Sequence, residues 1–297
     1  MKKIRIIIVV SLLAIAACNN NQTIQSNNNM DPEKKGGIAF KSGYSAVNGI
    51  KMYYEMYGAG EPLVLLHGGG STIQSTFERV IPQLAASYKV IAVELQNHGR
   101  SGFRDSPETF EQDADDVAAL LKNIGISKAY FFGFSNGGHT AIEIYLRHAG
   151  IVKKLILASS PYKRNCFFPG FFDGFENVTL ETMPQPLHEA FLKVNPDTAK
   201  LQIMFERDRD RMKTFKGWTD EQLKSIKVPT LIISGDADVM PPECAVEMHR
   251  LIAHSELAIL PGIHGEYIAE AATLHNDKSD TVFIVPMIET FLDKQIQ

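Results

Sequence analysis

Gly133-Phe134-Ser135-Asn136-Gly137 is the stretch that decides the fold of this 297-residue chain. It stands between an apolar run over 129–134, which predicts a buried strand, and a run over 137–148 that predicts a helix. The serine of such a strand-to-helix turn projects its hydroxyl beyond the end of the strand. The flanking glycines are needed because a Cβ at either position would clash with the neighbouring strand or helix. The motif therefore predicts that Ser135 is an exposed nucleophile.

Outward from this turn, apolar segments of strand length alternate with segments of helical periodicity. The predicted strands cover 50–57, 63–66, 89–94, 129–134, 155–159, 228–234 and 256–260, and the predicted helices cover 77–87, 110–124, 137–148, 242–253 and 283–294. This alternation predicts an α/β fold, which is built around a mostly parallel sheet.

The segment 161–222 breaks the alternation. It is rich in aromatic residues and is interrupted by Pro169, Pro184 and Pro186. It is too long for a simple connection between two strands, so we predict an inserted helical cap. Within it, the run ERDRDR at 206–211 mixes charges of both signs at helical spacing, and we expect it to be a solvated helix face.

Two downstream motifs supply partners for the serine. GDAD at 235–238 and PGIHG at 261–265 each follow a predicted strand, so Ser135, Asp238 and His264 occur in the chain order Ser…Asp…His. A serine hydroxyl is a weak nucleophile by itself. A histidine would take its proton, and a buried aspartate would fix the histidine tautomer and stabilise the imidazolium. Asp236 is the alternative acid.

A glycine-rich turn, HGGGS at 67–71, follows another predicted strand. Acyl transfer needs two backbone N–H groups aimed at the developing oxyanion. We expect one from Asn136, the residue after the nucleophile, and the other from Gly69, with Gly70 as the second choice. A phosphate-binding loop is disfavoured, because neither the Lys-Ser/Thr of a P-loop nor the third glycine of a dinucleotide motif follows.

With these residues in view, the chain resembles the α/β-hydrolase superfamily, in its capped esterase and non-haem haloperoxidase-like branch. The resemblance rests on LVLLHGGG (63–70), VELQNHGRS (93–101), GFSNGG (133–138), GDAD and PGIHG, and it runs from about residue 43 to the C-terminus. It implies an eight-stranded, mostly parallel sheet, a cofactor-free Ser-His-Asp triad and an acyl-enzyme intermediate. The Gly-x-x-Asp spacing of the family favours Asp238 over Asp236. Asn97 replaces a usual glycine, but asparagine tolerates positive φ.

The resulting expectation is a serine hydrolase of the carboxylesterase class (EC 3.1.1) that acts on an uncharged, medium-sized acyl or aryl ester, with Phe134 and Tyr162 as pocket walls. The same triad could instead support perhydrolysis, or the cleavage of lactones, amides or carbon–carbon bonds. Outside the enzymes, the alternative is a binding module that has lost activity. No cofactor is expected. No metal is expected either, because no histidine pair has ligand spacing together with a third ligand.

The N-terminus reads as an export signal. Basic residues precede an apolar run over 6–17, which is too short to span a membrane and is typical of a signal peptide over 1–17. The sequence IAAC at 15–18 resembles the lipobox of bacterial lipoproteins, which predicts lipidation of Cys18; an ordinary signal peptide is the alternative. We expect an Asn-rich tether over 18–42, a core over 43–160 and 223–297 around the cap, and a lipid-anchored protein of the cell envelope.

Composition excludes several other classes of protein. The formal net charge of -4 argues against a nucleic-acid partner, since such proteins usually carry a concentrated basic face. Three cysteines are too few for a disulfide scaffold. We expect Cys166 and Cys244 to be free thiols; the alternative, which an oxidising compartment would permit, is a bridge between them that would join the cap to the core. We expect His67 and His98 to have only structural roles in turns.

Overall fold

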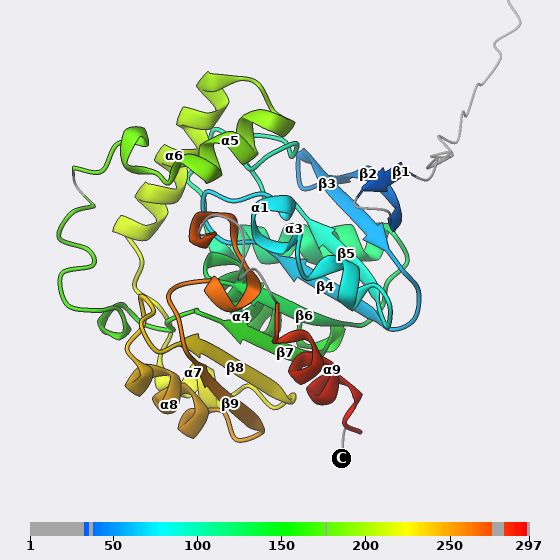
Figure 1. Ribbon diagram of the computed structural model, residues 1–297, viewed down its shortest axis with the longest axis vertical. Helices are drawn as coiled ribbons and strands as arrows, with labels where there is room; N and C mark the ends of the chain where they lie inside the picture. The colour runs from blue at the N-terminus through cyan, green and yellow to red at the C-terminus, as the bar shows by residue number, and fades with distance from the viewer. Residues whose placement is uncertain (1–32, 36–37, 176, 275–281, 296–297) are drawn as a thin grey trace, which may run out of the picture.

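The computed structural model describes residues 33–35, 38–175, 177–274 and 282–295. These residues form one nine-stranded sheet with helices on both faces (Figure 1), in the order β1-β2-β3-β5-β4-β6-β7-β8-β9. The strands are β1 (Glu33–Lys35), β2 (Ile38–Val47), β3 (Ile50–Tyr57), β4 (Pro62–Leu66), β5 (Lys89–Val93), β6 (Ala129–Phe134), β7 (Val152–Ala158), β8 (Thr230–Gly235) and β9 (Ser255–Leu260). Strands β4 to β9 are parallel, and β1 to β3 are antiparallel to their neighbours. The predicted α/β fold with a mostly parallel sheet is confirmed.

The sheet begins earlier in the chain than predicted. Strands β1 and β2 start before residue 43, inside the segment 18–42 that was assigned to the polar tether, and β1 is the strand beyond the expected eight. Asn48 and Gly49 join β2 to β3 with positive φ at both positions. A two-residue hairpin turn requires this conformation, and an Asn-Gly pair provides it at little cost. The Asn-Gly pair was therefore the sequence signal for β2.

Two hydrophobic layers cover the two faces of the sheet. Helices α1 (Ile73–Phe77), α2 (Ile81–Leu84) and α9 (Val285–Asp293) pack on one face, and α3 (Phe110–Asn123), α4 (Asn136–His148) and α8 (Pro242–Leu251) pack on the other. Strand β4 serves both layers, because successive side chains of a strand point to opposite faces. Leu63 and Leu65 lie in the first layer, while Val64 and Leu66 lie in the second.

The single helix predicted over 77–87 is instead two short helices, α1 and α2. Thr72 begins α1 with a capping box that it shares with Ser75. Pro82 lies at the start of α2. Because proline lacks an N–H and its ring clashes with the preceding turn, a helix cannot continue through it, and a second helix starts there.

The segment between β7 and β8, which was predicted as the cap, contains α5 (Gln185–Val194), α6 (Thr198–Lys213) and α7 (Asp220–Lys224). Helices α5 and α6 lie together next to α1 (Figure 1), and α6 contacts the turns that follow β4 and β6, whereas α7 contacts α8. The expectation of a solvated face over 206–211 is wrong for two of its residues. Asp208 and Arg211 are buried, because residues three apart share one helix face and this face of α6 is turned toward the core.

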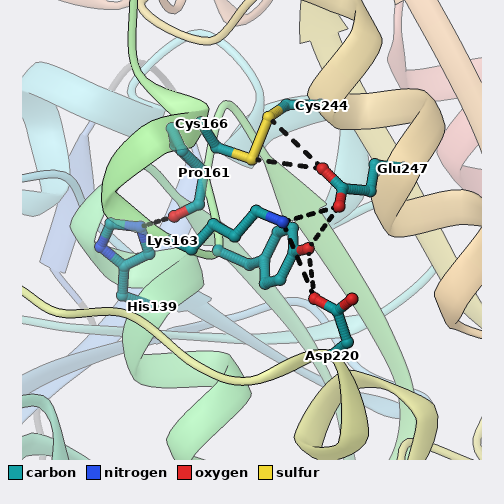
Figure 2. The surroundings of a disulfide bond; sticks show 8 residues. His139, Pro161, Lys163, Cys166, Asp220, Cys244 and Glu247 are labelled. Atoms are coloured by element: carbon teal, nitrogen blue, oxygen red, sulfur yellow. Dashed lines mark hydrogen bonds and ion pairs between the residues drawn. A yellow bond between two sulfur atoms is a disulfide. The ribbon is translucent and has the colours of Figure 1, made fainter.

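Cys166 and Cys244 form a disulfide, so the expectation of free thiols is wrong. The two residues are 78 positions apart in the sequence, and only the fold brings their Cα atoms to 5.6 Å. Figure 2 shows Glu247 beside the bridge, with one carboxylate oxygen 3.9 and 4.0 Å from the two sulfur atoms. The disulfide joins the segment that leads out of β7 to helix α8 of the core.

The predicted signal peptide, the lipidation site Cys18 and most of the predicted tether lie outside the described residues. Within the parts of the chain that the structure describes, no helix is long and apolar enough to cross a membrane.

Candidate functional site

Ser135 lies in a strained turn between β6 and α4, with φ 53° and ψ −122°. The backbone packing explains the two flanking glycines. A Cβ on Gly133 would lie 2.2 Å from the carbonyl oxygen of Gly137, and a Cβ on Gly137 would lie 2.0 Å from the carbonyl oxygen of Leu66. The turn therefore forms only when both positions are glycine, and it projects the serine side chain from the carboxyl end of β6.

The variant Gly137→Ala tests this packing. Because its Cβ would meet backbone rather than a flexible side chain, we expect the free energy of unfolding to fall by about 2–3 kcal/mol. The matched control is Gly150→Ala, where a Cβ would meet nothing within 4 Å. Denaturant unfolding of both variants measures the difference. Equal stability of the two variants would contradict the steric explanation.

Ser135, His264 and Asp238 form a continuous hydrogen-bonded chain. His264 Nδ1 lies 2.6 Å from Asp238 Oδ1, and His264 Nε2 lies 3.1 Å from Ser135 Oγ. A carboxylate can only accept, so Nδ1 carries the proton and Nε2 is free to accept the serine hydroxyl proton. The fold thus brings together three residues predicted from sequence, with His264 hydrogen-bonded between Asp238 and Ser135.

The carboxylate of Asp238 is held by several donors. It accepts the backbone N–H of Gly235 at 3.0 Å and that of Val239 at 2.7 Å, together with the hydroxyl of Ser159. Burial tends to raise the pKa of Asp238, but the hydrogen bond and charge of His264 and these further donors lower it below the ordinary value. Asp238 is therefore ionised and ready to orient His264.

The alternative acid, Asp236, takes no part in this chain. Its carboxylate accepts the backbone N–H of Gly262 at 2.9 Å in an exposed position. The two aspartates thus have different contacts. Asp236 accepts a hydrogen bond from the loop that carries His264, and Asp238 contacts His264 itself. Sequence reasoning missed two supporting residues, Ser159 and Tyr267, whose hydroxyls lie 2.6 Å apart beside Asp238. The one local signal is Ser159 itself, a polar residue directly after a buried strand.

Two backbone donors lie next to the serine. Asn136 is the first residue of α4, and no acceptor for its N–H is found among the described residues, as is usual for the first turn of a helix. The N–H of Gly69 likewise has no acceptor within the described part of the chain. The N–H of Gly70, the second choice from sequence, donates to Asp208 at 2.5 Å. Of the two glycines, Gly69 is the one whose N–H is available.

A cavity of about 250 Å³ adjoins these donors. Its walls are Gly69, Gly70 and Asn136 from the core and mostly apolar residues from the segment between β7 and β8, namely Phe175, Val178, Thr182, Met183, Pro184, Leu187, Phe205, Asp208, Arg209 and Met212.

The expectation that Tyr162 is a pocket wall is wrong. Its ring is fully buried, and its hydroxyl lies within hydrogen-bond distance of Asp220 and Glu247, beside the disulfide. Phe134 lies under the triad, with its ring centre 4.8 Å from that of His264.

A larger, open hollow of about 870 Å³ lies elsewhere. Most of its walls come from α3 and the segment 125–127, which precedes β6, and Asn48, His148 and Ile151 complete them. It is therefore at the amino end of β6, whereas Ser135 follows the carboxyl end of β6. This hollow does not belong to the site around Ser135. One group of described residues has metal-ligand spacing, namely Cys166, Cys244 and Glu247, but the two sulfur atoms are bonded to each other.

Glu270 is a buried carboxyl group next to this site, and it gives the fold a pH dependence. It accepts the N–H of Ala272 at 2.8 Å and the hydroxyl of Ser71 at 3.4 Å, yet burial raises its pKa to about 7. Between its ordinary value and pH 7 the folded state keeps a proton that the unfolded state has lost. Stability from this group is therefore lost as the pH rises through that window.

The variant Glu270→Gln should remove this effect. Relative to the wild type, we expect it to gain about 1–2 kcal/mol of unfolding free energy between pH 5 and pH 8. Denaturant titrations of both proteins at the two pH values measure the gain, and titration of all other groups cancels in the difference. If the two proteins differ by the same unfolding free energy at pH 5 and at pH 8, Glu270 is already ionised in the folded state at pH 5.

Comparison with known proteins identifies the family. Residues 61–183 match the alpha/beta hydrolase fold family. The chain is 30% identical over 262 residues to the AB hydrolase superfamily protein YisY of Bacillus subtilis, and the match covers 76% of this chain and 93% of that protein. This protein belongs to the α/β-hydrolase superfamily.

Other α/β hydrolases resemble this chain more distantly. The pimeloyl-[acyl-carrier protein] methyl ester esterase of Vibrio atlanticus is 27% identical over 247 residues, which is 74% of this chain and 93% of that enzyme. Among solved structures, a serine hydrolase involved in carbazole degradation (CarC) superposes with a TM-score of 0.69 at 22% identity, covering 86% of this α/β hydrolase and 99% of CarC. The second similarity supports the fold alone.

Proposed function

We propose that this α/β hydrolase is a serine hydrolase that cleaves carboxylic esters. Ser135 attacks the ester carbonyl while His264 takes its proton, and Asp238 keeps the imidazole oriented. The N–H groups of Asn136 and Gly69 stabilise the oxyanion of the tetrahedral intermediate. His264 then protonates the leaving alcohol, and water attacks the acyl-enzyme by the same route in reverse.

The observation that carries this proposal is the hydrogen-bonded chain from Asp238 Oδ1 to His264 at 2.6 Å and from His264 to Ser135 Oγ at 3.1 Å. The oriented histidine is what distinguishes an activated serine from a serine that merely begins a helix. The similarity to a methyl ester esterase agrees with ester hydrolysis. The cavity beside Asn136 is small and mostly apolar, which favours an uncharged acyl group of modest size.

We further propose that Cys18 is lipidated after removal of residues 1–17, and that the protein is anchored to the cell envelope. The basic n-region, the short apolar run and the IAAC sequence support this placement. Globomycin treatment or a Cys18→Ser substitution, followed by fractionation of the producing cells, would test it. The Cys18→Ser protein should leave the membrane fraction, and its retention there would contradict the lipid anchor.

Reaction with a fluorophosphonate probe tests the nucleophile without a guess about the substrate. We expect peptide mass spectrometry to find the label on Ser135 and to find none in His264→Ala. The matched control is His254→Ala, since His254 is exposed and its ring is not part of the triad. Absence of label on the folded wild type would argue for a binding role.

A substrate panel then tests the reaction. It compares p-nitrophenyl esters of increasing acyl length with a matched anilide, a lactone and a perhydrolysis assay with acetate and peroxide. We expect the short esters to give the highest kcat/KM, because the cavity of about 250 Å³ limits the acyl group. If Ser135 is labelled but the enzyme prefers the anilide, the lactone or peracid formation, the proposed triad stands and the ester assignment is wrong.

A further inference from the structure

Asp208 of α6 extends from the segment between β7 and β8 to the glycine-rich turn. Its Oδ2 accepts the backbone N–H of Gly70 at 2.5 Å, and its Oδ1 lies 3.5 Å from the side-chain nitrogen of Asn136. Both contacts are with segments that carry the oxyanion donors. The Asp208 side chain is 11% exposed, so it is largely removed from water.

Two cations hold this carboxylate in place. His98 Nε2 donates to Asp208 Oδ2 at 2.9 Å, and Arg211 donates to Oδ1. Burial alone would lower the pKa of His98, but Asp208 and Glu108 raise it to about 9, so the imidazole is charged. Burial alone would raise the pKa of Asp208, but His98 and Arg211 hold it well below its usual range. The carboxylate therefore lies beside the oxyanion site with its charge compensated.

This compensation matters for the chemistry. A bare carboxylate near a developing oxyanion would oppose the reaction, whereas a neutralised one can serve as a fixed acceptor. The bond from Gly70 to Asp208 helps to set the orientation of the peptide between Gly69 and Gly70, where Gly70 has φ 65°. The carbonyl of the same peptide has only a long contact, 3.4 Å from the Ser71 hydroxyl. A Cβ on Gly69 would lie 2.5 Å from the side chain of Asn136 and 3.2 Å from Asp208. The turn is thus enclosed between these two side chains.

Docking of α6 on the core does not depend on Asp208 alone. Arg211 also binds Asp113 of α3 at 2.8 Å, and Asn195, just before α6, donates to the carbonyl of Gly99 at 2.8 Å. These two contacts join the helical segment to the core at positions away from the glycine-rich turn. The bond from Gly70 to Asp208 is different, since it fixes the turn itself.

On the basis of the proposed esterase function, we propose that Asp208 is a positioning residue for the oxyanion hole. It anchors the Gly69–Gly70 peptide, and through the Cα of Gly69 it restrains the preceding Gly68–Gly69 peptide, whose N–H faces the tetrahedral intermediate. Since Asp208 belongs to α6 and the turn belongs to the core, the second oxyanion donor is in place only when α6 is docked. The helical segment then contributes to catalysis as well as to the substrate pocket.

The test compares Asp208→Leu and Asp208→Ala with the control Asp210→Asn, which changes an exposed carboxylate on the same helix. Asp208→Leu keeps about the size of the side chain but has no acceptor for the Gly70 N–H, and it serves as the test if the alanine variant does not fold. We expect kcat/KM for p-nitrophenyl butyrate to fall by about 10- to 100-fold in the Asp208 variants, with the loss in kcat. Asp210→Asn should match the wild type.

Inhibition separates positioning from simple anchoring. A trifluoromethyl ketone forms a tetrahedral oxyanion on the serine, while the corresponding secondary alcohol binds without one. We expect the Ki of the ketone to rise by the factor by which kcat/KM falls, and the Ki of the alcohol to stay within about twofold. If the Ki values of both inhibitors and the KM of the ester rise together, Asp208 only anchors the helix and the proposal is wrong.

Hydrogen exchange gives a readout that needs no activity. We expect amide exchange in the peptide that contains Gly69 and Gly70 to accelerate in Asp208→Ala and not in Asp210→Asn. Unchanged exchange in folded Asp208→Ala or Asp208→Leu overturns the positioning of the turn, whether or not the protein is an esterase. If exchange accelerates in Asp208→Ala but the wild type hydrolyses no ester, the positioning role of Asp208 stands and the proposed ester hydrolysis is wrong.

Discussion

Replacement of Ser135 by alanine is expected to lower kcat for ester hydrolysis by about 10⁵- to 10⁶-fold while leaving the fold intact. The serine oxygen forms the bond to the acyl group, so no other group in the hydrogen-bonded chain can substitute for it. Asp238→Asn should have a smaller effect, about 10⁴-fold, because it impairs only the orientation and tautomer of His264. Steady-state kinetics on the best ester of the substrate panel measures both losses.

The control for this experiment is Ser225→Ala, which removes the hydroxyl of an exposed serine after α7. It should retain the kcat of the wild type. Circular dichroism and the unfolding midpoint should be unchanged in Ser135→Ala, since an alanine keeps the Cβ of the turn. Residual activity of more than about one part in a thousand in Ser135→Ala would assign the reaction to another nucleophile.

Loss of the disulfide is expected to have the largest effect on stability. Cys166 and Cys244 enclose a chain segment of 78 residues, and cross-linking a segment of that length removes much of the entropy of the unfolded chain. The double variant Cys166→Ala/Cys244→Ala should lose about 4 kcal/mol of unfolding free energy and melt about 8–15 °C lower. Calorimetry and denaturant unfolding measure the two quantities.

Reductant provides the matched control. A phosphine reductant should lower the Tm of the wild type to that of the double variant and should not change the double variant. The effect concerns the helical segment in particular, because the bridge joins its start to α8, and α8 follows the loop that carries Asp238. Equal melting of the wild type and the double variant without reductant would show that other contacts already restrain this segment.

The core of the candidate site could be predicted because each of its parts is a local motif. The glycines around Ser135 are required by backbone contacts of about 2 Å, and such contacts leave a fixed pattern in the sequence. Asn97 follows the same logic, since its φ is 62°, as expected where glycine is usual. Asp238 and His264 each follow a strand, so their order and spacing were informative before any geometry was known.

Other features were predicted wrongly because they depend on contacts between distant segments. Tyr162 is an aromatic residue at the start of the predicted cap, yet its neighbours are Asp220, Glu247 and the disulfide rather than a substrate. His98 lies in a turn, as expected, but its carboxylate partner 110 positions away was not predicted. No local sequence pattern indicates the partners of Tyr162 or of His98.

The sequence by itself determined the alternation of strands and helices from residue 50 onward and the nucleophile turn, because periodicity and steric exclusion act over a few residues. Only the tertiary structure decided which members of the run at 206–211 are solvated and whether the two cysteines meet. Burial of a charge depends on the partners that compensate its lost hydration, and Asp208 and Arg211 find them in His98 and Asp113, on other elements. The contact between α6 and the glycine-rich turn is a property of the packed structure.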